Sequence, residues 1–247
     1  MSDAPSSTPS AAALGVVFDF GQVLIDWDPV RAIAAGVGRD EAERFLADFD
    51  FHAWNLACDA GRSWDDALAE LERTHPQYAA HGRAYREHFA HALVGEIPGT
   101  AAIVRELHAA GVPLAGLTNW SDELYHAHAP QRFDVLGLLD DVIVSGTEKL
   151  AKPDAAIYRL VAERTGRPLS SWVFVDDRQV NVDAAVALGM DGIVFTDAAS
   201  LRTALRERGL PLGPARPDRI DPWQTSTGTP GTSAATRPGI SPGPSRS

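Results

Sequence analysis

Residues 16–26 read VVFDFGQVLID, an apolar run that ends in the carboxylate of Asp19 and continues through a turn at Gly21. Consecutive apolar residues of this kind are typical of a strand that is buried on both faces of a parallel sheet. In open α/β sheets, ligands bind at the carboxyl ends of the strands. The segment therefore predicts an α/β fold in which Asp19 lies at the ligand-binding edge of the sheet.

Four further apolar runs have the same character as the first. The five predicted strands cover residues 14–18, 112–117, 142–144, 172–175 and 192–195. Helical patterns lie between most of them, and three of these patterns end at a glycine, at residues 100–110, 153–165 and 182–188. Strands that alternate with helices predict a doubly wound parallel sheet. The helix after Lys152 is expected to begin at Pro153, because proline is favoured in a first helical turn.

The segment from residue 28 to residue 97 interrupts this alternation, and we expect no strand in it. Its pattern predicts helices at residues 29–35, 40–49, 51–58, 63–74 and 77–93. Asp28 precedes the first of them as an N-cap, and Ser63 with Asp66 forms an N-cap arrangement. An insert directly after the turn of the first strand would cover the carboxyl edge of the sheet, where a lid belongs. We therefore predict a core of residues 14–27 and 98–213 and a helical cap of residues 28–97.

Composition sets limits on the two ends and on the compartment. Residues 1–13 are small and polar, and residues 214–247 are rich in Pro, Gly, Ser and Thr, so both are predicted to be disordered. The first residues lack the pattern of a secretory signal, and no apolar run has the length of a membrane span. Cys58 is the single cysteine, which fits a reducing compartment. These features predict a cytoplasmic protein.

The formal net charge of −11 argues against nucleic acid and anionic membranes as partners. A small anionic substrate remains compatible with this charge, because a metal ion and a few cations can reverse the field inside one pocket. The sequence indicates no particular oligomeric state.

Two of the later strands lead into polar residues that suit phosphate. Thr118 and Asn119 follow the second strand, where a hydroxyl can donate to a phosphoryl oxygen, although both types also favour ordinary turns. Lys149 and Lys152 are the only lysines among 22 basic residues. A compact ammonium group can bridge a carboxylate and a phosphate where a planar guanidinium would not fit. A solvated surface lysine is the alternative, and we expect it for Lys149.

Asp176 and Asp177 follow the fourth strand directly. Two adjacent carboxylates after an apolar run are costly unless a cation neutralises them. Mg²⁺ suits this site, because it prefers oxygen ligands and takes few of them from protein. Two solvated loop aspartates are the alternative. Asn181 is placed to orient the metal's surroundings.

These segments together resemble the four motifs of the haloacid dehalogenase (HAD) superfamily, most of whose members are phosphatases. The resemblance covers roughly residues 14–209, and it implies a nucleophilic Asp19, a phosphate-binding Lys152 and a helical cap over small substrates. It also implies Mg²⁺ held by Asp19, the Gly21 carbonyl and Asp176, and we add Asp177 as a candidate ligand.

Gly21 departs from the phosphatase pattern, which usually has a second Asp at this position as the general acid and base. Acid–base help is typically worth about 10²–10⁴ in rate, and it matters less when the leaving oxygen is a weak base. The sequence Asp-Phe-Gly-Gln-Val is similar to the Asp-x-Gly-Asn-Val form of bacterial α-glucose-1-phosphate phosphatases, which are active members of the superfamily. Asp28 or His52 could supply the missing acid.

The predicted cap holds further candidates for substrate contact: His52, Trp54, Asn55, Asp59 and Arg62. Trp54 is more typical of a packed core, and Trp120, after the second strand, either lines the pocket or packs. Of this group we assign His52 and Arg62, together with Thr118, Asn119 and Lys152, to substrate binding.

Three functions fit these motifs. The first is a Mg²⁺-dependent phosphomonoesterase that acts on a small phosphorylated metabolite, such as a sugar phosphate, through an aspartyl-phosphate. The second is a metal-independent 2-haloacid dehalogenase, which Gly21 permits but the pair Asp176-Asp177 opposes. The third is a non-catalytic, phosphatase-like binding protein.

Overall fold

The computed structural model describes residues 14–214. The predicted disordered ends, residues 1–13 and 214–247, lie outside this part of the chain apart from residue 214. Within the described part, no helix combines the length and the apolarity needed to cross a membrane.

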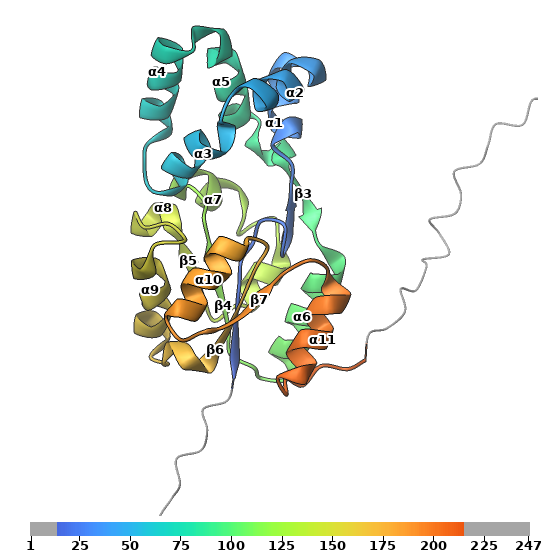
Figure 1. Ribbon diagram of the computed structural model, residues 1–247. Coiled ribbons are helices and arrows are strands. Elements are labelled where there is room, and N and C mark those ends of the chain that lie inside the picture. Colours follow the sequence, from blue (N-terminus) through green and yellow to red (C-terminus); the bar gives the residue numbers. More distant parts are fainter. Residues whose placement is uncertain (1–13, 215–247) are drawn as a thin grey trace, which may run out of the picture. The chain divides into compact units, whose positions relative to one another are not determined.

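A parallel sheet of five strands confirms the predicted α/β fold (Figure 1). Its strands are β1 (Gly15–Phe18), β4 (Leu114–Thr118), β5 (Asp141–Val144), β6 (Trp172–Asp176) and β7 (Asp191–Val194). They lie in the order β5-β4-β1-β6-β7, and every neighbouring pair is parallel. The chain fills one side of β1 first and then the other, so β1 lies at the point where the strand order reverses, as in doubly wound folds that bind ligands there.

Helices cover both faces of the sheet. Val16 and Phe18 belong to the apolar cluster that includes α6 (Pro98–Ala109) and α11 (Ala198–Glu207). Val17 belongs to the cluster with α9 (Ala155–Thr165) and α10 (Gln179–Ala187). Alternate side chains of one strand thus enter two cores, which explains why the strand is apolar at every position.

Three predicted helix starts are wrong. Helix α6 begins at Pro98 rather than at residue 100, with the proline in its first turn. Helix α9 begins at Ala155 rather than Pro153, because Asp154 is its N-cap and accepts from the backbone N–H of Ala156. The Lys152–Pro153 peptide bond is cis and precedes the helix. Helix α10 begins at Gln179 rather than at residue 182, so a polar first turn that the apolar pattern did not reveal belongs to it.

Five helices follow β2 (Ile25–Trp27), and we call them the cap. They are α1 (Pro29–Val37), α2 (Arg39–Asp48), α3 (Phe51–Asp59), α4 (Trp64–Thr74) and α5 (Ala79–Glu87), and Figure 1 shows them grouped at one end of the sheet. Asp28 and Ser63 cap α1 and α4 as predicted. The helix predicted at residues 77–93 is divided into three parts, with 3₁₀ turns at Pro76–Tyr78 and Phe89–Ala92 on either side of α5.

The expectation of no strand in residues 28–97 is also wrong. Strand β3 (Leu93–Glu96) pairs antiparallel with β2, and this short ribbon carries the chain into and out of the cap. The pairing joins segments that are far apart in the sequence, and neither segment has a strand-length apolar pattern alone. The boundaries of core and cap as domains stay a prediction.

The remaining elements connect the strands. They are α7 (Asp122–His128), α8 (Ser145–Glu148) and the 3₁₀ turns Asp134–Leu138 and Leu169–Ser171.

Candidate active site

The ends of three strands bring the predicted residues of the motifs together. The register places Phe18 of β1 beside Gly116 of β4 and Val175 of β6. The backbone N–H of Asp19 donates to the carbonyl of Val175 at 2.9 Å. Asp19 therefore leaves the sheet between the end of β4, at Thr118, and the end of β6, at Asp176.

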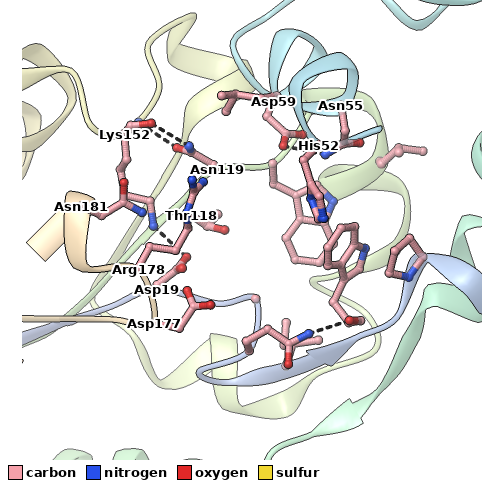
Figure 2. Close-up of a pocket in the computed structure, with 18 of the residues that line it drawn as sticks. Asp19, His52, Asn55, Asp59, Thr118, Asn119, Lys152, Asp177, Arg178 and Asn181 are labelled. Carbon is pink, nitrogen blue, oxygen red and sulfur yellow. Dashed lines mark hydrogen bonds and ion pairs between the residues drawn. The ribbon is translucent and has the colours of Figure 1, made fainter. Parts of the chain in front are cut away.

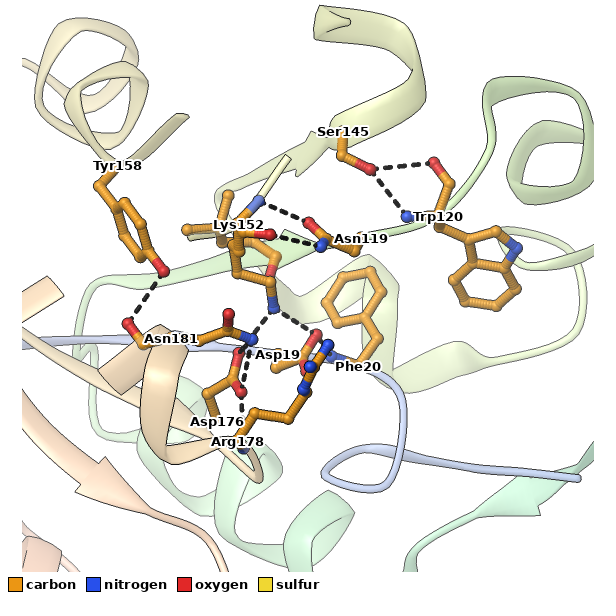
Figure 3. Close-up of polar contacts among 11 residues, drawn as sticks. Asp19, Phe20, Asn119, Trp120, Ser145, Lys152, Tyr158, Asp176, Arg178 and Asn181 are labelled. Atoms are coloured by element: carbon orange, nitrogen blue, oxygen red, sulfur yellow. Dashed lines mark hydrogen bonds and ion pairs between the residues drawn. The ribbon is translucent and has the colours of Figure 1, made fainter. Parts of the chain in front are cut away.

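Lys152 lies at the centre of this cluster and is 2 % exposed (Figure 3). Its Nζ lies 2.8 Å from Asp19 Oδ1 and 2.7 Å from Asp176 Oδ2, and it donates to the Leu117 carbonyl at 2.9 Å. Burial lowers the pKa of Lys152, but the two carboxylates outweigh this effect and hold the pKa above its usual value. The ammonium group is therefore charged, and it compensates two buried acids that would otherwise be unpaired.

Asp19 is 8 % exposed and presents its carboxylate to the same cluster. Its Oδ1 accepts from the backbone N–H of Phe20 at 2.7 Å as well as contacting Lys152. The pKa of Asp19 is raised to about 7. Burial is the largest cause and raises it, the Lys152 ammonium lowers it, and the charge of Asp176 raises it. Both contacts are to the same oxygen, and they hold the carboxylate in one orientation.

Asp176 is fully buried and is held by the start of α10. Its Oδ1 accepts from the backbone N–H of Arg178 at 2.9 Å and from Asn181 Nδ2 at 3.0 Å. The Tyr158 hydroxyl donates to the Asn181 carbonyl at 2.9 Å and so fixes the turn from the other side. Asn181 thus contacts the carboxylate that it was expected to orient.

The carboxylates of Asp19, Asp176 and Asp177 offer oxygens that lie within 4.8 Å of one another. Burial raises the pKa of Asp177, and the charge of Asp176 adds to this rise. A divalent cation would relieve this repulsion, and three carboxylates are hard oxygen ligands of the kind that Mg²⁺ prefers. Gly21, whose carbonyl is the further predicted ligand, lines the same cavity.

Asn119 lines the cavity, and its side chain also binds the backbone of Lys152. Its side-chain amide donates to the Lys152 carbonyl at 3.0 Å, and its Oδ1 accepts from the Lys152 backbone N–H at 2.8 Å. This double hydrogen bond fixes the loop that carries Lys152. Thr118 is 1 % exposed and lines the cavity directly.

A cavity of about 860 Å³ opens between this cluster and the cap (Figure 2). The cap contributes His52, Asn55 and Asp59 to its wall, and His52 is exposed there. Arg62, predicted to bind substrate, is not among the lining residues. Its guanidinium pairs instead with the Glu70 carboxylate and donates to the Asp66 carbonyl, because both groups lie beside it on α4.

Asp59 is an unusual member of this wall because it is buried and forms no ion pair with any residue between 14 and 214. It is 8 % exposed, and its Oδ2 accepts from Asn55 Nδ2 at 2.8 Å. Burial raises its pKa to about 7, and a backbone hydrogen bond from Ser121 partly opposes the rise. The Asp59 carbonyl accepts from Ser145 Oγ at 2.5 Å, which joins the end of α3 to the core.

Trp54 packs in the aromatic interior of the cap, in agreement with the alternative interpretation of that residue. Trp120 is buried and lines the cavity at the same time. Asp28 was one of two candidates for the missing general acid, but it caps α1 and pairs with Arg31. Asp28 is not among the residues that line the cavity, whereas His52 is.

The sequence did not single out three of the residues that shape the site. Arg178 lines the cavity and directly follows the pair Asp176-Asp177, a position that could have identified it. Tyr158 and Ser145 act through contacts with residues far away in the chain, so no local signal distinguishes them.

Comparison with known families identifies the chain at the level of its class. Residues 13–189 match the model of haloacid dehalogenase-like hydrolases. The chain therefore belongs to the haloacid dehalogenase-like hydrolase family, and it is an enzyme related to phosphatases.

Two curated relatives are phosphatases. Phosphoglycolate phosphatase of Pseudomonas syringae is 31% identical over 199 residues, which cover 71% of this chain and 66% of that protein. The sesquiterpene phosphatase astK of Aspergillus oryzae is 31% identical over 106 residues, which cover 43% of this chain and 54% of the relative. The match thus spans about half the length of the Aspergillus protein.

Among solved structures, the HAD family enzyme bt-2542 of Bacteroides thetaiotaomicron has the same fold. It is 19% identical, with a TM-score of 0.62 over 78% of this chain and 98% of that one. A further structure of that enzyme is a complex with magnesium and inorganic phosphate, and it matches with 20% identity and a TM-score of 0.57 over 75% of this chain and 96% of that one.

Proposed function

We propose that this protein is a Mg²⁺-dependent phosphomonoesterase that acts through an aspartyl-phosphate on Asp19. The observation that carries this proposal is the cluster of Asp19, Lys152 and Asp176 at the end of the sheet, facing a cavity large enough for a substrate. The phosphatase relatives and the magnesium-phosphate complex of a protein with the same fold support it.

In this mechanism, a carboxylate oxygen of Asp19 attacks phosphorus and the bond from phosphorus to the alcohol oxygen breaks. The leaving alkoxide takes a proton from water, and a water molecule then attacks the phosphorus of the aspartyl-phosphate, which releases inorganic phosphate and restores the Asp19 carboxylate. Lys152 and Thr118 hold the phosphoryl oxygens, and Asn119 keeps the backbone of Lys152 in place. Catalysis by such a site consists mainly of positioning and electrostatic stabilisation.

The donor set fits Mg²⁺, with Asp19, the Gly21 carbonyl and Asp176 as ligands and Asp177 as a further one. When bound, the ion supplies positive charge that offsets the phosphoryl oxygens and the surrounding carboxylates. Asn181 keeps Asp176 oriented for this role through its hydrogen bonds to both carboxylate oxygens, at 3.0 and 3.1 Å.

The missing acid at Gly21 limits the substrates that would react fast. Because Asp28 is committed to a helix cap, His52 is the predicted alternative that still faces the cavity. Esters with a weakly basic leaving oxygen need no acid at all. We therefore propose a small phosphorylated metabolite as the substrate.

The test is release of phosphate from acetyl phosphate and an aryl phosphate, each with Mg²⁺ and with a chelator, by the native chain and by Asp19→Asn. We expect turnover that requires both Mg²⁺ and Asp19. Halide release from 2-chloropropionate that the chelator does not affect would instead support the dehalogenase. If neither phosphate nor halide is released, the result would favour the non-catalytic binding protein.

A further inference from the structure

The wall of the cavity on the side of the cap differs in character from the cluster at the end of the sheet. Four aromatic side chains lie on it, from four separate segments: Trp27, Tyr85, Phe89 and Trp120. Aliphatic side chains fill the spaces between them: Ile25, Pro29, Ala53, Leu56 and Leu124. With a wall of this composition, the main favourable contribution to binding comes from burying apolar surface of the ligand.

Each of the two amides that share this wall donates one hydrogen bond to a protein partner. Gln22 Nε2 donates to the Trp27 carbonyl at 2.6 Å, and Asn55 Nδ2 donates to Asp59 Oδ2 at 2.8 Å. A sugar exposes many hydroxyl groups, and each one that loses water without gaining a partner costs free energy. One N–H of each amide is thus already used, so less of their hydrogen-bonding capacity remains for the hydroxyl groups of a polyol.

The charges around the cavity also divide into two groups. The described residues that line the cavity include one lysine, Lys152, and one arginine, Arg178, and both lie on the sheet side. The cap side contributes Asp59 and the imidazole of His52, while Arg62 pairs with Glu70 outside the wall. A second anionic group on the organic part of a substrate would thus meet Asp59 and no lysine or arginine among the described residues of this side.

From this division we infer that the site takes phosphomonoesters whose alcohol part is bulky, apolar and uncharged. The inference rests on the proposed phosphatase function and names its substrate class. The phosphoryl group lies against Asp19 and Lys152, and the apolar group lies among Trp27, Tyr85 and Phe89. The volume of about 860 Å³ is near the upper end of the roughly 300–1,000 Å³ found for pockets that bury a drug-sized ligand.

The first experiment compares three phosphate esters of primary alcohols, because their leaving groups then differ little in reactivity. Citronellyl phosphate carries a branched apolar chain, glucose 6-phosphate carries a polyol, and phosphoglycolate carries a carboxylate. We expect kcat/KM for citronellyl phosphate to exceed the other two by about tenfold or more, since one or two buried methylene groups already contribute about that factor.

A higher kcat/KM for glucose 6-phosphate or for phosphoglycolate would overturn the inference and leave the phosphatase proposal intact. Acetyl phosphate is the reference that separates the two, because it has almost no organic part. If neither acetyl phosphate nor any ester releases phosphate with Mg²⁺, the proposed function itself fails.

A pair of variants tests whether the apolar wall causes the preference. Ala53 is exposed on α3 and lines the cavity, so Ala53→Trp fills space without disturbing the core. Ala80 is exposed on α5 and lies outside the lining, so Ala80→Trp is the matched control. We expect Ala53→Trp to lower kcat/KM for citronellyl phosphate about tenfold, and acetyl phosphate far less. Equal losses for both substrates, or a similar loss in Ala80→Trp, would contradict the inference.

Discussion

The two sides of the cavity differ in how their polar groups are satisfied. At the end of the sheet, Asp19, Lys152 and Asp176 compensate one another at 2.7–2.8 Å, and each also contacts the backbone. On the cap side, Asp59 is buried, and its hydrogen bonds come from the neutral donors Asn55 and the Ser121 backbone. This difference is the basis of our proposal that the sheet side carries out the reaction and that the cap side selects the substrate.

The largest effect is expected on the sheet side, from replacing Lys152. Lys149, the other lysine of the sequence, provides a matched control. Lys152→Met leaves two buried carboxylates without a counter-charge, so we expect a loss of about 3–5 kcal/mol in the free energy of unfolding. Phosphatase activity should fall more than about 10³-fold, as for other members of a catalytic cluster. Urea unfolding and kcat/KM measure the two effects.

Lys149→Met is the control, because Lys149 is exposed. It should change stability by less than about 0.5 kcal/mol. If both variants behave alike, the cluster around Lys152 does not have the role assigned to it.

On the cap side, Asp59→Asn should stabilise the protein in a pH-dependent way. Burial raises the pKa of Asp59 from 3.8 to about 7, so the native state holds a proton that the unfolded state has lost between these values. Native stability therefore falls as pH rises from about 4 to 7, by up to about 4 kcal/mol at about 1.4 kcal/mol per pKa unit. The variant avoids this loss and should melt higher than the native chain at pH 8, but not at pH 4.

Thermal unfolding at the two pH values checks this expectation. Asp26→Asn is the matched control, because Asp26 is an exposed aspartate on β2 outside the cavity wall. A gain for Asp59→Asn that is the same at both pH values would show that its charge is not the cause. The same variant should raise kcat/KM for phosphoglycolate relative to citronellyl phosphate.

A smaller effect, a gain in rate, is expected from introducing a general acid at Gly21, where the phosphatase pattern usually has an aspartate. A Cβ built on Gly21 meets no atom within 4 Å, and the backbone there does not have a positive φ, so an aspartate fits. Gly21→Asp should raise kcat for primary alkyl phosphates by about tenfold or more, since acid–base help is worth about 10²–10⁴.

Gly21→Asn adds a side chain of the same shape that cannot transfer a proton, and it should give no such increase. An equal increase in both variants would mean that shape rather than acidity is responsible.

The smallest effect is expected for Arg62, which the sequence placed in the substrate site. Its ion pair with Glu70 lies at the surface of the cap, with the two side chains 26% and 46% exposed. Surface pairs contribute about 0–1 kcal/mol, so Arg62→Ala should cost no more than that and should leave kcat/KM within about threefold. Steady-state kinetics that show a large increase in KM would return Arg62 to the binding site.

The features that the sequence predicted correctly are local ones. Each core strand carries its own apolar run, and Asp19 and Asp176 follow such runs directly, so the residues at the end of the sheet were visible as motifs. The pairing of β2 with β3 depends on a partner strand far away in the chain, and neither segment shows it alone. Likewise, nothing beside Arg62 in the sequence indicates that its guanidinium pairs with Glu70, and nothing beside Asp59 indicates its burial.

The proposed aspartyl-phosphate can be detected directly by quenching the native chain during turnover of acetyl phosphate with Mg²⁺ and digesting it for mass spectrometry. We expect the peptide that contains Asp19 to gain the mass of one phosphoryl group, which hydroxylamine removes. This modification should be absent from Asp19→Asn. Rapid turnover with the Asp19 peptide unmodified at every quench time, or a phosphoryl group on another residue, would contradict the central claim.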